Sequence, residues 1–437
     1  MTTRPPLRRS LPLLFSAILG VATLWSADPQ LIGENDRASP FYAPGEKMTF
    51  RIRLQQDGAP VIGPKLEWTR TGDDGREDRG EATAAADPLV VTTELDRPGF
   101  VRIRVRALGE DGKPLRDSQN KEIIFDGGAG VEPEKLAGVP EPGDFDAWWA
   151  AQKALLAQVP VELLERRPLE PTHPNVDTWD VKIACAGPIL PGDTAPKPVS
   201  GYLSITRGAS PRSAEAVVSF HGYGVRGASR SDGQANDPAK PKIILNINAH
   251  GIENGRPADY YKELEQTVLK GYAFNRQQNE NPDTSYLRGM SLRVLRALEF
   301  VKTLPEWDGK RLSVTGGSQG AFQALVGAAF DPDVTYCYAG KPWLTDLGGV
   351  TLGRLKGWRP DYTRGLDYFD TINLAKRIRC ETHIIAGLGD YVCPPSGLSV
   401  LYSNLPEKTP KRITYHQGAT HGVTPSNMAK FVVSNKP

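Results

Sequence analysis

The sequence of 437 residues predicts two folded parts, a small β-sandwich of immunoglobulin type followed by an α/β domain with a mostly parallel sheet. Two observations lead to this prediction. Between Ser39 and Phe125, apolar and polar residues alternate with period two, which is typical of half-buried strands. Beyond Asp177, apolar strand-like runs alternate with helical stretches, which is typical of a parallel sheet.

The amino-terminal segment has the pattern of a secretory signal peptide, which we place at residues 1–27. Three arginines precede an apolar run at 11–24, and the small residues Ser26 and Ala27 follow it. This run is shorter than the roughly 20 residues that a membrane-spanning helix needs. We therefore expect a secreted or periplasmic protein that has no membrane association after cleavage.

The β-sandwich is predicted at residues 28–127. Its strands are expected where the alternation is clearest, at 48–54, 66–68, 89–93, 100–105 and 123–125, with turn residues between them. The region contains neither histidine nor cysteine, so no catalytic group is visible in it. A spacer role and a carbohydrate-binding role both stay open. The glycine- and proline-rich residues 128–143 are expected to form a linker.

The α/β domain is predicted at residues 144–437. A helix should begin behind Asp144, because apolar residues follow it at helical spacing. Strands are expected at 214–220, 243–247, 312–315, 382–386 and 413–415, with a long helix at 286–304. This alternation predicts a sheet that is covered by helices on both faces.

Charge and cysteine content exclude several classes of protein. Lys and Arg number 53 against 51 Asp and Glu, and no basic stripe appears, so a nucleic-acid partner is not expected. The chain has only four cysteines, which cannot form a disulfide scaffold, and no Cys-x-x-Cys pair suggests zinc. We expect mostly free, buried thiols, although sequence cannot choose among the three possible pairings. These cysteines are Cys185, Cys337, Cys380 and Cys393.

A Gly-x-Ser-x-Gly motif at Gly316, Ser318 and Gly320 provides the candidate nucleophile. The preceding residues read as a strand and the following residues read as a helix. This strand–turn–helix context is that of a nucleophile elbow, in which glycines allow a sharp turn that lifts the serine hydroxyl above the sheet. The motif predicts an α/β-hydrolase fold with Ser318 as the nucleophile.

A serine nucleophile needs a histidine base and a carboxylate that orients it, in the chain order Ser, Asp or Glu, His. His421 lies in a loop past the last predicted strand, whereas His383 lies inside a strand and His416 ends one. We therefore predict His421 as the base. Asp390 follows a strand at its carboxyl end and is the predicted acid, with Asp346 as its competitor.

An oxyanion hole needs two donors aimed at the developing charge. The amide of Gln319, directly after the nucleophile, is the first candidate. The second is an amide of Gly222 or Tyr223, in the loop after the strand at 214–220. His221 is expected to form structural hydrogen bonds. This chemistry requires neither a metal nor an organic cofactor.

The chain resembles the acetyl xylan esterase and cephalosporin C deacetylase group, carbohydrate esterase family seven. The resemblance covers about residues 139–432 and is carried by these motifs: Phe220-His221-Gly222-Tyr223, Gly317-Ser318-Gln319-Gly320, Gly389-Asp390 leading to Cys393-Pro394-Pro395, Pro342-Trp343-Leu344-Thr345-Asp346 and the helix at Phe145–Trp149. It implies the triad Ser318, Asp390 and His421, with the amides of Tyr223 and Gln319 as oxyanion donors. It also implies a homo-oligomer, since members are typically hexamers whose active sites face an internal chamber.

The chain departs from the family pattern in three places. Gly422 stands where members commonly have a glutamate, the loop at 224–237 differs and carries two arginines, and the β-sandwich is additional. The sequence therefore predicts an exported serine esterase that removes O-acetyl groups from xylo-oligosaccharides or related small acetylated carbohydrates. A general short-chain carboxylesterase is the main alternative, and a serine peptidase of prolyl oligopeptidase type is a weaker one.

Overall fold

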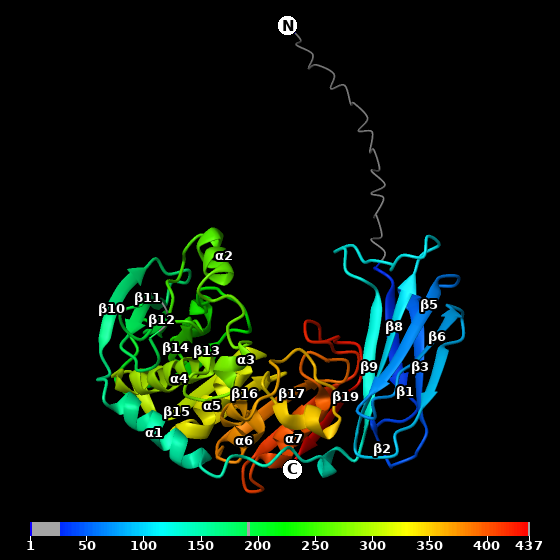
Figure 1. The fold of residues 1–437 in the computed structure, drawn as a ribbon. Coiled ribbons are helices and arrows are strands. Elements are labelled where there is room, and N and C mark those ends of the chain that lie inside the picture. Colours follow the sequence, from blue (N-terminus) through cyan, green and yellow to red (C-terminus); the bar gives the residue numbers. More distant parts are fainter. Residues whose placement is uncertain (2–26, 190–192, 436–437) are drawn as a thin grey trace.

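A computed structural model describes residue 1 and residues 27–189 and 193–435 (Figure 1). The predicted signal peptide therefore lies almost entirely outside the described residues. The predicted order, a β-sandwich followed by an α/β domain, is confirmed. Within the described part of the chain, no helix is both long enough and apolar enough to cross a membrane.

The sandwich consists of two sheets around one apolar core. The first sheet contains β1 (Gln30–Asn35), β3 (Met48–Gln56), β4 (Ala59–Pro60) and β7 (Leu89–Thr93). The second has the order β2 (Phe41–Tyr42), β9 (Ile124–Val131), β8 (Gly99–Leu108), β5 (Lys65–Gly72) and β6 (Asp78–Thr83). The alternating burial of β3 and β8 follows their alternating sequences.

The prediction of a linker at residues 128–143 is wrong in its first part, because Gly128–Val131 belong to β9. The glycines serve close packing of backbones here, since a Cβ at Gly128 would lie 2.3 Å from the carbonyl oxygen of Val101. The true connection follows β9 and contains the short turn η1 (Pro133–Lys135).

The α/β domain is built on one ten-stranded sheet. Its order is β10 (Leu163–Leu169), β11 (Val176–Ile183), β12 (Val199–Thr206), β14 (Lys242–Ile247), β13 (Ala214–Phe220), β15 (Trp307–Gly317), β16 (Tyr336–Gly340), β17 (Glu381–Gly387), β18 (Lys411–His416) and β19 (Lys430–Ser434). The strands from β14 to β18 are parallel, so their carboxyl ends share one edge, where loops can bring side chains together.

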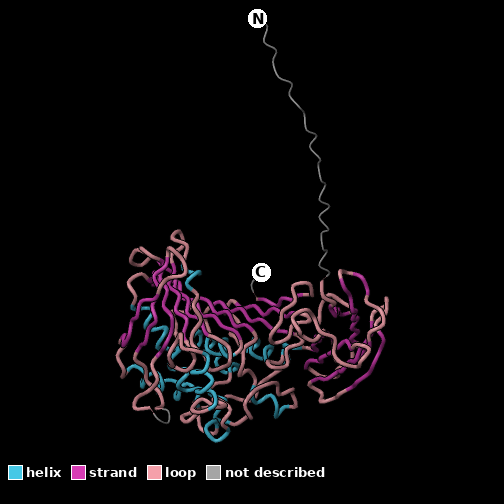
Figure 2. Tube along the Cα trace, turned by 90° about the horizontal axis from the view of Figure 1, so that it is seen from above, coloured by secondary structure: helices cyan, strands magenta, loops and turns pink. Residues whose placement is uncertain are grey.

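Five helices form one continuous layer on one face of this sheet (Figure 2). They are α1 (Phe145–Ala157), α4 (Tyr286–Thr303), α5 (Gln319–Phe330), α6 (Thr371–Ala375) and α7 (Pro395–Asn404). Two further helices, α2 (Ala258–Gln266) and α3 (Arg276–Asn279), and the turns η3 (Leu347–Leu352) and η4 (Arg364–Tyr368) lie in loops.

The expectation of helices on both faces is wrong. The crossover from β13 to β14 contains only the short turn η2 (Asp232–Ala235), which packs on β11, β12 and β14, and β18 is followed by β19 rather than by a helix. The strands match this arrangement, because polar residues in register form a partly exposed row across the uncovered face. The row contains Ser219, Thr315, Tyr338, His383 and Arg412.

Candidate active site

The strand–turn–helix at Ser318 has the geometry of a nucleophile elbow. Ser318 connects β15 to α5 with φ 57° and ψ −120°, a conformation that residues with a side chain rarely adopt. A Cβ at Gly316 would lie 2.3 Å from the Gly320 backbone, and one at Gly320 would lie 2.2 Å from the carbonyl oxygen of Phe220. Both motif glycines are therefore required for the turn to pack.

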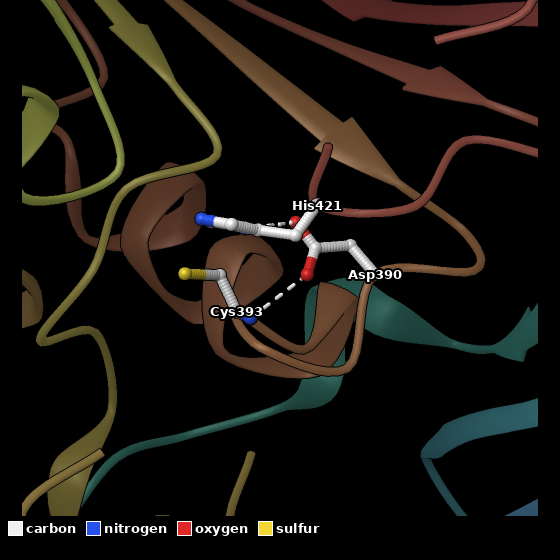
Figure 3. A group of neighbouring side chains, drawn as sticks. All are labelled: Asp390, Cys393 and His421. Atoms are coloured by element: carbon white, nitrogen blue, oxygen red, sulfur yellow. Dashed lines mark hydrogen bonds and ion pairs between the residues drawn. The ribbon is translucent and has the colours of Figure 1, made fainter. Parts of the chain in front are cut away.

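The structure brings the three predicted side chains into one hydrogen-bonded chain. His421 Nε2 lies 3.0 Å from Ser318 Oγ. On the other side of the ring, His421 Nδ1 lies 2.9 Å from Asp390 Oδ2 (Figure 3). Ser318 follows β15, Asp390 follows β17 and His421 follows β18, so all three come from the carboxyl edge of the parallel strands. This is the separation that a serine, its base and the orienting acid require.

Asp390 is fully buried, and both of its oxygens are engaged. Its Oδ1 accepts the backbone N–H groups of Val392 and Cys393, each at 3.0 Å, while Oδ2 faces His421. Asp390, Cys393 and His421 each offer one atom of a type that can bind a metal ion, and these three atoms lie within 4.8 Å of one another (Figure 3). Burial raises the pKa of the Cys393 thiol well above its usual range. The carboxylate and the imidazole of this group are already engaged in the hydrogen-bonded chain to Ser318.

The loop that carries His421 is attached to the sheet by Lys341, which directly follows β16. The Lys341 ammonium contacts the carbonyl oxygen of Thr420, lies 3.3 Å from those of His421 and Val423, and donates to Thr424 Oγ1 at 3.0 Å. Burial lowers the pKa of Lys341. The lysine is thus surrounded by oxygens of the one loop that must hold the base in place.

The two segments that carry the predicted oxyanion donors both adjoin Ser318. Gln319 is the first residue of α5, so its N–H has no partner within the helix. The loop after β13 adjoins the elbow, since a Cβ at Gly222 would lie 3.7 Å from that of Ser318. Tyr272 ties the two segments together, because its hydroxyl donates to Gln319 Oε1 at 2.8 Å and accepts the Gly224 N–H at 2.9 Å.

Two buried histidines fix the loop after β13. His221 Nε2 accepts the backbone N–H of Ala249 at 3.1 Å, as a structural rather than a catalytic residue would. His250 contacts the carbonyl oxygen of Gly224 at 3.1 Å and the Tyr286 hydroxyl at 2.7 Å. Burial lowers the pKa of His221 to about 4 and that of His250 to about 3, so both are neutral at pH 7.

The competing candidates lie in other contacts. Asp346 forms a bidentate ion pair with Arg354, at 2.6 and 2.7 Å. His383 lies 3.0 Å from Thr414 Oγ1 on the uncovered sheet face. His416 remains the last residue of β18, and burial lowers its pKa. None of these three contacts Ser318 among the described interactions.

A cavity of about 530 Å³ opens beside Ser318 and His421 on the uncovered side of the sheet. Most of the side chains that line it are polar, and they include Ser219, Ser231, Gln234, Asn246, Thr315, Tyr338, Lys341 and Thr424. The four cysteines are free and buried, as expected.

The fold and the elbow define a member of the α/β-hydrolase class. The family model described as acetyl xylan esterase (AXE1) matches residues 136–353 and 359–434, and the chain belongs to this family. It is therefore a carboxylic ester hydrolase by family, and the matched part begins after the β-sandwich.

Individual relatives agree with this assignment. The chain is 26% identical over 320 residues to the acetyl esterase Axe7A of Xylanibacter ruminicola, covering 71% of this chain and 68% of that protein. Its fold is similar to that of an acetyl xylan esterase from Paenibacillus sp. R4, with a TM-score of 0.54, 24% identity and coverage of 66% and 93% of the two chains. It is also similar to acetyl xylan esterase 1 from Thermoanaerobacterium sp. JW/SL YS485, with a TM-score of 0.55, 22% identity and coverage of 68% and 94%.

Sequence reasoning missed the residues that support the site. Lys341, Tyr272 and His250 are separated from the motifs they contact by long stretches of chain, and no local pattern marks them. Lys341 alone carried a signal, since it is a charged residue directly after an apolar strand, at the edge where the site was expected.

Proposed function

We propose that this protein removes O-acetyl groups from xylo-oligosaccharides or related acetylated carbohydrates through an acetyl-enzyme intermediate. The observation that carries the proposal is the hydrogen-bonded chain from Asp390 through His421 to Ser318. Membership of the acetyl xylan esterase family supports the acetyl group and the carbohydrate as the two parts of the substrate.

The proposed reaction has two halves. Ser318 Oγ attacks the acetyl carbonyl carbon while His421 Nε2 accepts its proton, and the negative charge on the carbonyl oxygen faces the amides of Gln319 and Tyr223. Collapse of this intermediate breaks the ester bond, and His421 gives the proton to the departing sugar oxygen. Water then attacks the acetyl-enzyme with His421 as base, which releases acetate and restores Ser318.

The polar cavity beside Ser318 supports a sugar as the leaving group. Hydroxyl and amide groups line it, and such groups form hydrogen bonds with sugar hydroxyls. A general short-chain carboxylesterase remains the competing function and is distinguished by acyl length.

The decisive experiment measures acetate release from acetylated xylo-oligosaccharides by the parent and by Ser318→Ala. We expect release by the parent only, and acetyl esters should be preferred to butyryl esters by p-nitrophenyl assay. If the parent hydrolyses p-nitrophenyl acetate but releases no acetate from the sugar, the assignment of Ser318 as nucleophile stands and the carbohydrate substrate is excluded. Equal activity of the variant on both substrates would overturn the mechanism.

Export is proposed on the pattern of residues 1–27 alone. Expression of the full chain in a bacterial host, followed by amino-terminal sequencing of protein from the periplasm or medium, tests it. A mature chain that begins near Asp28 is expected. Full-length protein retained inside the cell would contradict export.

A further inference from the structure

The β-sandwich lies outside the segment matched by the family model, yet one of its strands contacts both loops that carry catalytic side chains. In Figure 1, β9 is the strand of the sandwich that faces β19 and the end of the large sheet. Its residues alternate in direction. Phe125, Ala129 and Val131 belong to the sandwich core. The opposite face of β9, which contains Asp126 and Gly128, therefore lies toward the α/β domain.

The first contact is with the loop that carries Asp390. A Cβ at Gly389 would lie 1.8 Å from the carbonyl oxygen of Asp126, and one at Gly128 would lie 2.9 Å from that of Leu388. Backbone therefore meets backbone on both sides, without side chains between them. Asp126 is in turn held by a bidentate ion pair with Arg102 of β8, which fixes this part of β9.

The second contact is with the loop that carries His421, through the fully buried side chain of Gln417. Its Oε1 accepts the Gly128 N–H at 3.0 Å, and its Nε2 donates to the Gly128 carbonyl oxygen, also at 3.0 Å. The amide thus pairs with Gly128 as a neighbouring strand would. The same Nε2 donates to Asn35 Oδ1 at the end of β1, so two strands of the sandwich hold Gln417.

The two loops are also tied to each other, because the Gly389 N–H donates to the carbonyl oxygen of Ala419 at 3.0 Å. Asp390 follows Gly389 directly, and His421 lies two residues beyond Ala419. From these contacts we infer that the β-sandwich is a positioning element of the active site, with Gln417 as the positioning residue that sets His421 against Asp390 and Ser318. In this role the sandwich is more than a spacer, and it does not need to bind carbohydrate.

The test replaces Gln417 with alanine in the full chain and measures kcat and KM on p-nitrophenyl acetate. Active sites are counted by titration with a serine-reactive phosphonate, so that misfolded molecules are excluded from kcat. A displacement of about 1 Å at the reacting groups costs on the order of 10²-fold in rate. We therefore expect Gln417→Ala to lower kcat per active site by about 10- to 100-fold with KM nearly unchanged, and to shift the pH profile of kcat/KM.

A matched control separates positioning from stability. Val91→Ala removes buried methyl groups from the sandwich core on β7, away from β9, and should lower the melting temperature without changing kcat per active site. Asn35→Ala removes only the sandwich side of the contact to Gln417, and should lower kcat per active site by a few-fold in a chain that folds normally. If both Gln417→Ala and Asn35→Ala keep parental kcat and pH profile, the inference is wrong.

A second readout is independent of catalysis, and it separates this inference from the proposed triad chemistry. Hydrogen exchange of the segments at 387–391 and 417–423 should be faster in Gln417→Ala than in the parent, and unchanged in Val91→Ala. Equal exchange in all three proteins would show that the sandwich does not hold the loops, whatever their activity.

Discussion

At the scale of single residues, the site depends on side chains that never touch the ester in the proposed reaction. Lys341 holds the loop that carries His421, while His221 and His250 fix the loop that carries the second predicted oxyanion donor. Burial keeps His221 and His250 neutral at pH 7, and Lys341 acts through its hydrogen bonds to the loop. Their contribution should therefore depend on charge and hydrogen bonding more than on volume.

Replacement of Lys341 by methionine keeps the length of the side chain and removes its N–H donors. Because three carbonyl oxygens and a hydroxyl then lose their shared partner, the base loop should loosen. We expect kcat to fall by about tenfold or more, with a smaller change in KM. Steady-state kinetics on p-nitrophenyl acetate measures this effect. Exposed Lys240→Met is the control, and a parental kcat in Lys341→Met would contradict the role.

Acid should destabilise the loop after β13. In the folded chain, burial depresses the pKa of His221 to about 4 and that of His250 to about 3, whereas both titrate near 6.5 when unfolded. The unfolded state therefore binds more protons below pH 6.5, and the free energy of unfolding should decrease as the pH falls from about 6.5 towards 4.

Urea denaturation at pH 7, 5.5 and 4.5 measures this dependence. The variant His250→Gln keeps hydrogen-bonding capacity without a titratable ring, so its free energy of unfolding should vary less with pH over the same range. An identical pH dependence in parent and variant would exclude His250 as a source.

At the scale of elements, the turn between β15 and α5 was predictable from sequence, because glycine spacing, strand and helix all point to it. The assignment of Ser318, Asp390 and His421 followed from the chain order Ser, Asp, His together with the positions of Asp390 and His421 after predicted strands. The uncovered sheet face was not predictable, because the apolar residues Val217 and Ile385 occupy partly exposed positions of β13 and β17 and mask the alternation. The packing of β9 was also missed, since glycine clusters indicate loops far more often than strands with close backbone contact.

The three glycines beside Ser318 should differ sharply when replaced by alanine. Gly316→Ala and Gly320→Ala place a Cβ within 2.3 Å of backbone atoms, whereas a Cβ at Gly317 would meet nothing closer than 3.8 Å. We expect the first two variants to lose about 3 kcal/mol or more of stability or to fail to fold. Gly317→Ala should keep a melting temperature close to that of the parent. Thermal unfolding ranks the three, and a similar melting temperature for all would contradict this account of the turn.

At the scale of the whole molecule, the sandwich and the α/β domain have separate apolar cores that are joined by a packed interface. Phe100 of β8 belongs to the core of the α/β domain, stacked on Tyr415 of β18 with ring centroids 6.2 Å apart. Asp73 of the sandwich accepts the Leu355 N–H at 3.1 Å. The two parts are therefore distinct in topology and continuous in packing.

A chain that begins at Glu132 should consequently fail to give a stable enzyme. Its Tyr415, Gly389 and Gln417 would lose their contacts with the sandwich. We expect aggregation or loss of activity, measured by soluble yield and by kcat per titrated active site. A chain that begins at Asp28 is the control. A soluble, fully active shortened chain would show that the α/β domain is independent.

The uncovered face of the large sheet also affects how this protein can change during evolution. Along β13, β16 and β17, one residue in two faces the helix layer and the next faces the partly exposed polar row. Neutral substitutions should therefore accumulate at the alternate positions that face the polar row, while the positions that face the helix layer stay conserved. Away from Ser318, new binding specificity can arise along this row without loss of the fold.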